Sequence, residues 1–175
     1  MENILTAMQT RRSIRQYKPD MLPKETIDKI IEAGLWAASG RDSQSSIIVA
    51  VTDKKLRDRL SKMNCAIGGW EPGFDPFYGA PVVLIVLADR NAPTPVYDGS
   101  LVIGNMMLAA HALGIGSCWI HRAKEEFESA EGRAILKKLG IEGEYEGIGH
   151  CVLGYPEGDA PEAPARIPGR VFYAE

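Results

Sequence analysis

The stretch Arg11-Arg12-Ser13-Ile14-Arg15 combines residue types that bind phosphate. A Lys-Pro pair follows shortly after it, and a residue that precedes proline is biased toward extended backbone. In an extended chain, alternate side chains face the same side. Arg11, Ser13 and Arg15 would then face one way, and Arg12 and Ile14 the other. Guanidinium forks bind phosphate oxygens in pairs and a serine hydroxyl adds a donor, so the spacing predicts a cradle for a single phosphate.

A solvated basic patch and a nucleic-acid contact are alternative interpretations of these arginines. The chain carries 20 basic and 23 acidic residues, for a net charge of -3. A general nucleic-acid binder needs a basic face to meet the phosphate backbone, and this balance argues against one. It leaves room for a local basic site that holds one small anion.

Cysteine and histidine could carry a different chemistry. Cys118 with His121, and His150 with Cys151, could supply four zinc ligands. Adjacent strand residues face opposite ways, however, so His150 and Cys151 do not easily share an ion. A Cys118–His121 nucleophile lacks a clear third group and an oxyanion motif. We therefore expect no metal and no side-chain nucleophile.

Glycine-rich phosphate loops are missing from the sequence. Neither a GxGxxG pattern after a strand nor a Walker pattern occurs. This disfavours a Rossmann NAD fold. A bound phosphate would be held by arginines.

The rest of the chain has to position this cradle, and its apolar patterns predict a single α/β or α+β domain over residues 1–175. The composition, 45% hydrophobic and 25% charged, suits a globular core. Helical periodicity predicts helices over residues 4–8, 23–38, 54–63, 98–113 and 130–139. β-Branched apolar runs predict strands over residues 47–51, 81–87, 117–120 and 147–154.

Two segments between these elements are expected to be irregular. Residues 39–46 are polar and lack periodicity, so they predict a loop. Residues 68–79 form a longer irregular segment, and loops of this length are usually functional or mobile. Its aromatic residues either line a pocket for a flat substrate or anchor the loop on the core; they are Trp70, Phe74, Phe77 and Tyr78.

The last segment, residues 156–175, is proline-rich and ends in the strand-like Arg170-Val171-Phe172-Tyr173. It cannot make a core of its own. Reaching over a second subunit is one solution, and lying back on its own domain is the other. We call this segment the C-terminal arm.

Cysteine usage and hydropathy bear on localisation. The cysteines, Cys65, Cys118 and Cys151, are odd in number and form no CxxC, so a disulfide framework is not expected. We recognise no signal peptide. The longest apolar run, residues 101–113, is too short to span a bilayer. These features predict a protein of the reducing cytoplasm without a membrane partner.

Taken together, four stretches resemble motifs of the nitroreductase family, in the order in which that family carries them. They are Arg11 to Arg15; residues 38–44, similar to a Pro-Ser-x-x-Asn-x-Gln loop; the helix and following strand up to Ile120; and Arg166-Ile167-Pro168, similar to a C-terminal Arg-x-Pro. The resemblance covers essentially the whole chain, and the length matches the compact branch of the family.

This resemblance implies an FMN-dependent homodimer with a three-layer α+β sandwich. The expected sheet is mostly antiparallel with helices on both faces, the flavins lie at the subunit interface, and the C-terminal arms are exchanged. The implied activity takes hydride from NADH or NADPH and reduces a nitroaromatic, quinone or similar flat acceptor by a ping-pong mechanism, without a catalytic side chain. The alternatives are a flavin-binding module without turnover and an anion-binding protein without flavin.

The resemblance also implies which residues contact FMN. The arginine/serine stretch and Arg166 would hold the phosphate, with Arg15 beside N1 and O2 of the flavin. The loop at residues 38–44 would come from the other subunit. Backbone at residues 120–122 would lie near N5 and O4, and Asn64 would reach the pyrimidine edge. The complete set is Arg11, Arg12, Ser13, Arg15, Ala38, Ser39, Gly40, Asp42, Gln44, Asn64, Ile120, His121, Arg122 and Arg166.

Several positions depart from the family pattern. Asp42 stands where asparagine is usual, and Ser45-Ser46 where Pro-Trp is common. Pro164 replaces a phosphate-binding lysine of some members, and His121-Arg122 replaces small or acidic residues. These changes bear on the substrate and on flavin tuning more than on the cofactor.

Overall fold

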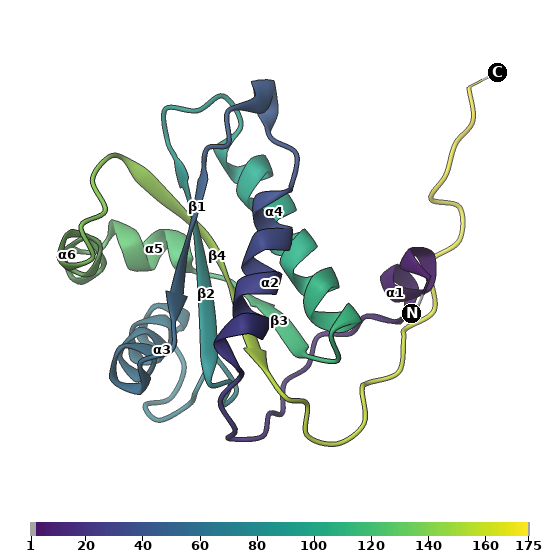
Figure 1. The fold of residues 1–175 in the computed structure, drawn as a ribbon, viewed down its shortest axis with the longest axis horizontal. Helices are drawn as coiled ribbons and strands as arrows, with labels where there is room; N and C mark the ends of the chain where they lie inside the picture. The colour runs from purple at the N-terminus through teal and green to yellow at the C-terminus, as the bar shows by residue number, and fades with distance from the viewer. Residues whose placement is uncertain (1–2, 175) are drawn as a thin grey trace.

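A computed structural model describes residues 3–174 (Figure 1). Its elements are, in chain order, α1 (Ile4–Thr10), α2 (Lys24–Leu35), the 3₁₀ turn η1 (Gly40–Asp42), β1 (Ser46–Val51), α3 (Lys54–Gly68), β2 (Val82–Asp89), α4 (Pro95–Ala112), β3 (Gly116–Ile120), α5 (Ala123–Glu128), α6 (Ala130–Lys138) and β4 (Tyr145–Gly154).

The strands pair into one antiparallel sheet in the order β1-β2-β4-β3. β2 lies inside the sheet, and residues 82–88 are buried on both faces because the strand is a continuous apolar run. β3 is an edge strand, so the side of β3 away from β4 stays free for other segments.

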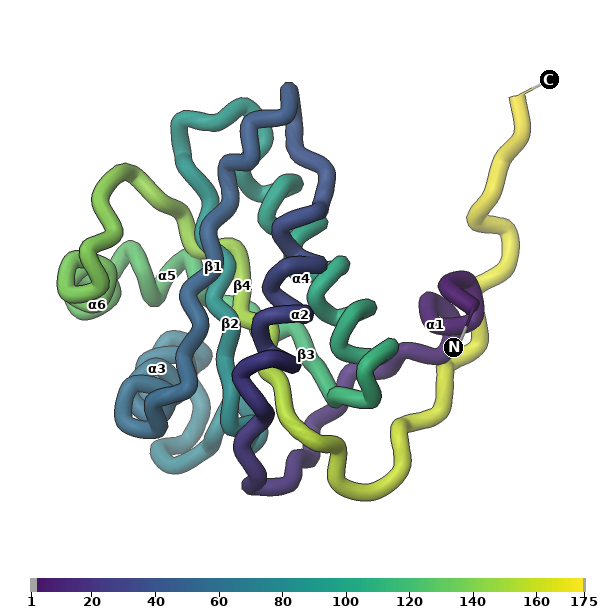
Figure 2. Tube along the Cα trace, viewed as in Figure 1, coloured from purple at the N-terminus to yellow at the C-terminus, as the bar shows by residue number. Residues whose placement is uncertain are grey.

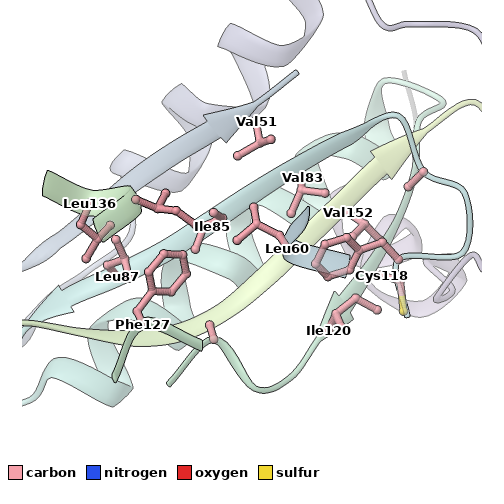
Figure 3. Packing of buried hydrophobic residues seen from close by; sticks show 14 of the residues in the cluster. Val51, Leu60, Val83, Ile85, Leu87, Cys118, Ile120, Phe127, Leu136 and Val152 are labelled. Atoms are coloured by element: carbon pink, nitrogen blue, oxygen red, sulfur yellow. The ribbon is translucent and has the colours of Figure 1, made fainter. Parts of the chain in front are cut away.

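Helices cover both faces of the sheet (Figure 1). Alternate residues of β2 enter two separate cores, as the two-residue period of a strand requires. Val83, Ile85 and Leu87 pack toward α3, α5 and α6 (Figure 3), and the intervening residues pack against α2 and α4. The prediction of an α+β three-layer sandwich is confirmed.

Most predicted elements are confirmed, with shifted ends. α2 stops at Leu35, before the predicted residue 38, and α4 begins at Pro95, before the predicted residue 98. α3 continues past the predicted end at Met63 to Gly68, and Asn64 in its last turns is buried. α5 was not predicted, since six residues are too few for apolar periodicity to show.

The C-terminal arm leaves β4 beside the N-terminal segment. Tyr17 bridges Pro156, and the Glu157 N–H donates to the Gln16 carbonyl at 3.0 Å. Residues 157–174 are exposed, and the arm passes α1 before it leaves the body of the chain (Figure 2). The strand-like tetrapeptide at 170–173 forms no strand here, because no partner strand lies beside it.

Within residues 3–174, no helix has the length and hydropathy needed to cross a membrane.

Candidate functional site

The predicted phosphate cradle is extended and lies on the free edge of β3. Ser13 forms a parallel bridge with Ser117, and the Ile14 N–H donates to the Ser117 carbonyl at 2.9 Å. α1 ends immediately before it, with Arg11 as the C-cap. The edge of the sheet therefore fixes the backbone that carries the arginines.

A cavity of about 760 Å³ opens beside this segment. That volume lies within the range of small-molecule and cofactor sites, ~300–1,000 Å³. Four arginines and one carboxylate line it, so the lining is strongly cationic. The charged residues are Arg11, Arg12, Arg15, Arg166 and Glu162.

The arginines of the cradle differ in how they are held. Arg11 Nη1 is buried without a hydrogen-bond partner in the described chain. Arg12 Nη1 donates to the carbonyls of Gln9 and Arg11, at 2.7 and 2.6 Å. Arg12 also lines the cavity, so the alternation does not fully separate it from Arg11 and Arg15. Ile14, which was predicted to face away from them, packs against the core. Among the described residues, Arg11 therefore has a buried guanidinium nitrogen without a partner, and Arg12 has none that is both buried and unpartnered.

Arg166 reaches the same cavity from the arm of its own chain. Its guanidinium donates to the Pro164 carbonyl. The family resemblance implied a phosphate contact for this residue, and the structure brings it to the cavity within a single chain.

The second predicted contact zone lies at the end of β3. The Asn64 Nδ2 donates to the His121 carbonyl at 2.8 Å, which brings α3 against residues 120–122. Arg122 has a left-handed backbone with φ 79°, and its guanidinium lies 4.4 Å from the Trp70 ring centre. The structure thus brings Asn64, Ile120, His121 and Arg122 together.

The aromatic loop at residues 68–79 is anchored and also partly open. Asp75 accepts hydrogen bonds from Arg57 and Ser61 at 2.5 and 2.6 Å, and Phe77 is fully buried. Trp70 and Phe74 are 38% and 42% exposed and pack edge to face. Phe77 therefore anchors the loop on the core, whereas the exposed rings of Trp70 and Phe74 can stack on a flat ligand.

The aromatic loop links the two ends of the candidate site. Phe74 packs against Tyr78, and Arg15 lies 5.9 Å from the Tyr78 ring centre. Trp70 meets Arg122 at the other end. The packed rings of Trp70, Phe74 and Tyr78 thus connect the cradle at Arg15 with Arg122.

The cysteine chemistry considered above finds no support. Burial raises the pKa of the Cys118 thiol, against the lowering effect of Arg15, Ser13 and Arg11, and a buried thiol is a poor nucleophile. His150 packs on Phe77 while Cys151 packs in the opposite core. Among the described residues no group of three or more His, Cys, Asp or Glu could hold a metal.

The loop that carries Ala38, Ser39, Gly40, Asp42 and Gln44 is strained. Arg41, Asp42 and Gln44 all have positive φ, between 46° and 56°. Such conformations persist only where surrounding structure imposes them, and they cluster at functional sites. At Gly40 a Cβ would lie 2.0 Å from Thr94 Oγ1, so the loop needs glycine there.

Asp98, on α4, imposes this conformation. Its carboxylate is buried and accepts hydrogen bonds from the Gly40 N–H and the Ser45 hydroxyl at 2.9 and 2.7 Å, and also from Thr94 and Ser43. Burial raises the pKa of Asp98, but these hydrogen bonds outweigh burial and leave the pKa below its ordinary value.

We expect Asp98→Asn to destabilise the protein by about 1–2 kcal/mol at pH 7, because the amide nitrogen cannot accept the bonds that one carboxylate oxygen accepts. A lowered carboxyl pKa stabilises the fold above the unfolded pKa of about 3.9, and this contribution is lost as pH falls through the folded pKa. Thermal unfolding should therefore separate the two proteins at pH 7, and their difference should begin to shrink below about pH 4 and vanish only below the folded pKa of Asp98. A constant difference at all pH values would contradict the assignment.

The loop and the cradle lie far apart in one chain. The segment at residues 38–45 is at the top of the view in Figures 1 and 2, and residues 11–15 lie beside β3 and α1 at the lower right. The structure assembles the cradle, Arg166 and the zone around Asn64 in one chain, but not the loop with them.

Sequence reasoning missed several residues that support these segments. Asp98 was seen only as a helix start, and Asp75 as part of a loop. Glu126, which accepts from Asn64 behind residues 120–122, and His150, which contacts Glu126, were not recognised as supporting residues. The available signal was polarity inside apolar patterns, since buried polar residues require partners.

Comparison with known proteins gives consistent matches. The Nitroreductase family description matches residues 8–66 and 70–155. A protein of Archaeoglobus fulgidus named for NADH dehydrogenase or NAD(P)H nitroreductase activity is 31% identical over 179 residues, covering 98% of this chain and 97% of that protein. A similarly named protein of Methanothermobacter thermautotrophicus is 31% identical over 67% of this chain, but only 60% of that protein is matched.

A solved structure agrees with these matches. The crystal structure of a nitroreductase with bound FMN from Bacteroides fragilis superposes with a TM-score of 0.91 at 27% identity, covering 100% of both chains.

Proposed function

The chain belongs to the nitroreductase family, and we propose that it is an FMN-dependent oxidoreductase that takes electrons from NADH or NADPH and reduces a flat aromatic or quinone-like acceptor. The observation that carries this proposal is the arginine-lined cavity beside β3. It stands in a fold that superposes on a nitroreductase with bound FMN.

The residues at the cavity fit FMN. A terminal phosphate is dianionic and needs several charged donors. The cavity offers four guanidinium groups, and one buried guanidinium nitrogen still lacks a partner. The lack of a glycine-rich dinucleotide loop agrees with a mononucleotide cofactor. We assign the phosphate to Arg11, Arg12, Ser13 and Arg166.

Bound FMN would supply the redox chemistry, accepting hydride from the nicotinamide and delivering electrons to the acceptor. The chain's own residues bind and orient. Arg15 would supply positive charge near N1 and O2, and Asn64 with residues 120–122 would hold the isoalloxazine ring. Donor and acceptor would use one site in turn, as a ping-pong mechanism requires.

The acceptor would lie between the flavin and the aromatic loop. Trp70 and Phe74 are partly exposed next to Arg122. Flat acceptors stack on such rings, and an adjacent guanidinium binds a nitro, carbonyl or carboxylate oxygen. This arrangement favours small aromatic or quinone-like acceptors.

A homodimer would complete the site. The strained loop at residues 38–44 cannot cover the cavity of its own chain, and the arm exposes the apolar side chains Ile167, Val171, Phe172 and Tyr173. We propose that the loop covers the partner's flavin and that the arms are exchanged. The cysteines are free and buried, which agrees with the proposed cytoplasmic location.

The test of the function is the purified protein itself. It should be yellow, release FMN and not FAD on denaturation at about one per chain, and oxidise NADH or NADPH when a quinone or nitroaromatic is present. Flavin without turnover would favour the alternative of a binding module. A colourless protein that cannot be reconstituted with FMN would refute the proposal.

Asp42 provides a test of flavin tuning. We expect Asp42→Asn to raise the flavin midpoint potential and to speed reduction by the nicotinamide, because the carboxylate opposes negative charge gained on reduction. Two charges ~8 Å apart at an effective dielectric of ~20–40 interact by roughly 1–2 kcal/mol, or about 20–45 mV for a two-electron couple.

The competing interpretation is that Asp42 pairs with Arg41 or caps the loop in solvent, where screening removes the effect on the flavin. Among the described residues no Asp42–Arg41 ion pair forms, and the Asp42 side chain is exposed in the single chain, so only the solvent-screened form of this interpretation is left to test. A redox titration at low salt compares the two proteins. An unchanged or lower potential in the variant would mean that Asp42 does not tune the flavin.

A further inference from the structure

Three polar side chains meet behind residues 120–122, inside the apolar core. Asn64, Glu126 and His150 are all 0% exposed. They come from α3, α5 and β4. The surrounding cluster includes Leu60, Ile120 and Phe127 (Figure 3). Polar groups in such a place are costly unless each is bonded, so their presence calls for a reason.

The hydrogen bonds among them follow from which atoms can donate. His150 Nδ1 lies 3.3 Å from the Ile120 carbonyl, which can only accept, so Nδ1 carries a proton. His150 Nε2 lies 2.9 Å from Glu126 Oε2, a contact that needs one more proton on either partner. The pair is neutral overall whichever partner holds that proton. Glu126 Oε1 remains an acceptor, at 2.6 Å from Asn64 Nδ2.

Two acceptors, Glu126 Oε1 and the His121 carbonyl, fix the orientation of the Asn64 side-chain amide. Nδ2 donates both to Glu126 Oε1 and to the His121 carbonyl, at 2.6 and 2.8 Å. A flipped amide would turn its oxygen toward two acceptors, which is unfavourable. The Asn64 Oδ1 is consequently held in one direction, and it has no partner among the described residues.

The same bonds orient the backbone of β3 at its end. The carbonyls of Ile120 and His121 are both held toward the buried side chains. In a planar trans peptide, a carbonyl and the following N–H point in opposite directions. The N–H groups of His121 and Arg122 therefore point away from the core. The Ser117 carbonyl accepts from Ile14 on the free edge of β3, and the Ile120 carbonyl faces β4, so the His121 N–H points toward that free edge.

We propose that Glu126 and His150 are positioning residues that, through Asn64, aim the N–H groups of His121 and Arg122 at the isoalloxazine ring of FMN. This inference rests on the proposed function. It predicts that the buried pair controls FMN affinity and the flavin potential without touching the cofactor.

The test replaces the buried pair with apolar residues of similar shape, in Glu126→Met/His150→Phe. Such replacements are often neutral or stabilising for the fold, so the double variant should fold. We expect it to bind FMN about tenfold more weakly, the loss of roughly one hydrogen bond. Its flavin potential should fall, because the donors that stabilise negative charge on the reduced ring are no longer held.

The matched control is Glu126→Gln. The glutamine oxygen accepts from Asn64 and its Nε2 donates to the unprotonated His150 Nε2, so every bond is kept while the shared proton is lost. We expect wild-type affinity and potential. A second control, Leu136→Ala, destabilises the same core cluster away from the polar side chains and should lower the melting temperature without moving the potential.

FMN titration by fluorescence, redox titration and thermal unfolding of the four proteins decide the matter. If wild type binds no FMN, the proposed function fails. If wild type binds FMN and the double variant matches it in affinity and potential, only the positioning role is overturned. If the double variant does not fold, His150→Phe alone removes the hydrogen bond to the Ile120 carbonyl and is measured in the same way. An unchanged FMN affinity and flavin potential in that variant would overturn the proposal.

Discussion

A chain cut after Gly158 is expected to fold, to remain monomeric and to retain no FMN. The cut leaves the bridge between Tyr17 and Pro156 and the bond from Glu157 to Gln16 intact. It removes an arm whose apolar side chains are exposed in the single chain, with Phe172 at 90% and Tyr173 at 86%. The arm makes no core contact that folding would need, so its effect should lie in assembly. Light scattering and flavin absorbance measure both results.

The control for this truncation is Arg166→Ala in the full-length chain. It removes the guanidinium that lines the cavity and leaves the rest of the arm in place. We expect a dimer with weaker FMN binding. If the truncated chain is still a dimer, the arm does not join the subunits, and a loss of FMN would then follow from the absence of Arg166, which lines the cavity of its own chain. A full-length monomer with flavin bound would exclude the shared site altogether.

The fold was largely predictable because its signals are local. The apolar run of β2 predicts a strand buried on both faces, and the glycines after α4 and α6, at positions 114 and 140, have the positive φ of helix ends. The extended backbone of the arginine/serine stretch was predictable for the same reason, since the Lys-Pro pair acts within a few residues.

The supporting polar residues were not predictable in this way. Asn64 interrupts an apolar pattern, and only the position of α5 reveals Glu126 as its partner. Asp98 is a common first-turn residue of a helix, and its bond to Gly40 spans 58 residues. The strand expected at residues 170–173 shows the same limit, because a strand requires a neighbour that the local sequence does not specify.

Arg11→Ala is expected to weaken FMN binding by about 1.5–3 kcal/mol, the scale of a hydrogen bond to a charged group, or roughly 10- to 150-fold in Kd. The same substitution should not destabilise the FMN-free protein. Arg11 Nη1 is buried without a partner, and an unsatisfied buried donor is itself unfavourable. The variant should therefore melt at or above the wild-type temperature without FMN, and below it at a fixed excess of FMN, because ligand stabilisation depends on [L]/Kd.

Arg12→Ala should behave in the opposite way. Its guanidinium is held by the carbonyls of Gln9 and Arg11 at the end of α1, so its loss should lower the stability of the FMN-free protein by about 0.5–1.5 kcal/mol. Its effect on FMN affinity should be smaller than that of Arg11. Thermal unfolding with and without FMN, together with FMN titration, measures both effects on both variants. Equal and negligible losses of FMN affinity would refute the cradle, because a phosphate held at this edge of β3 must use the guanidinium whose donor is free.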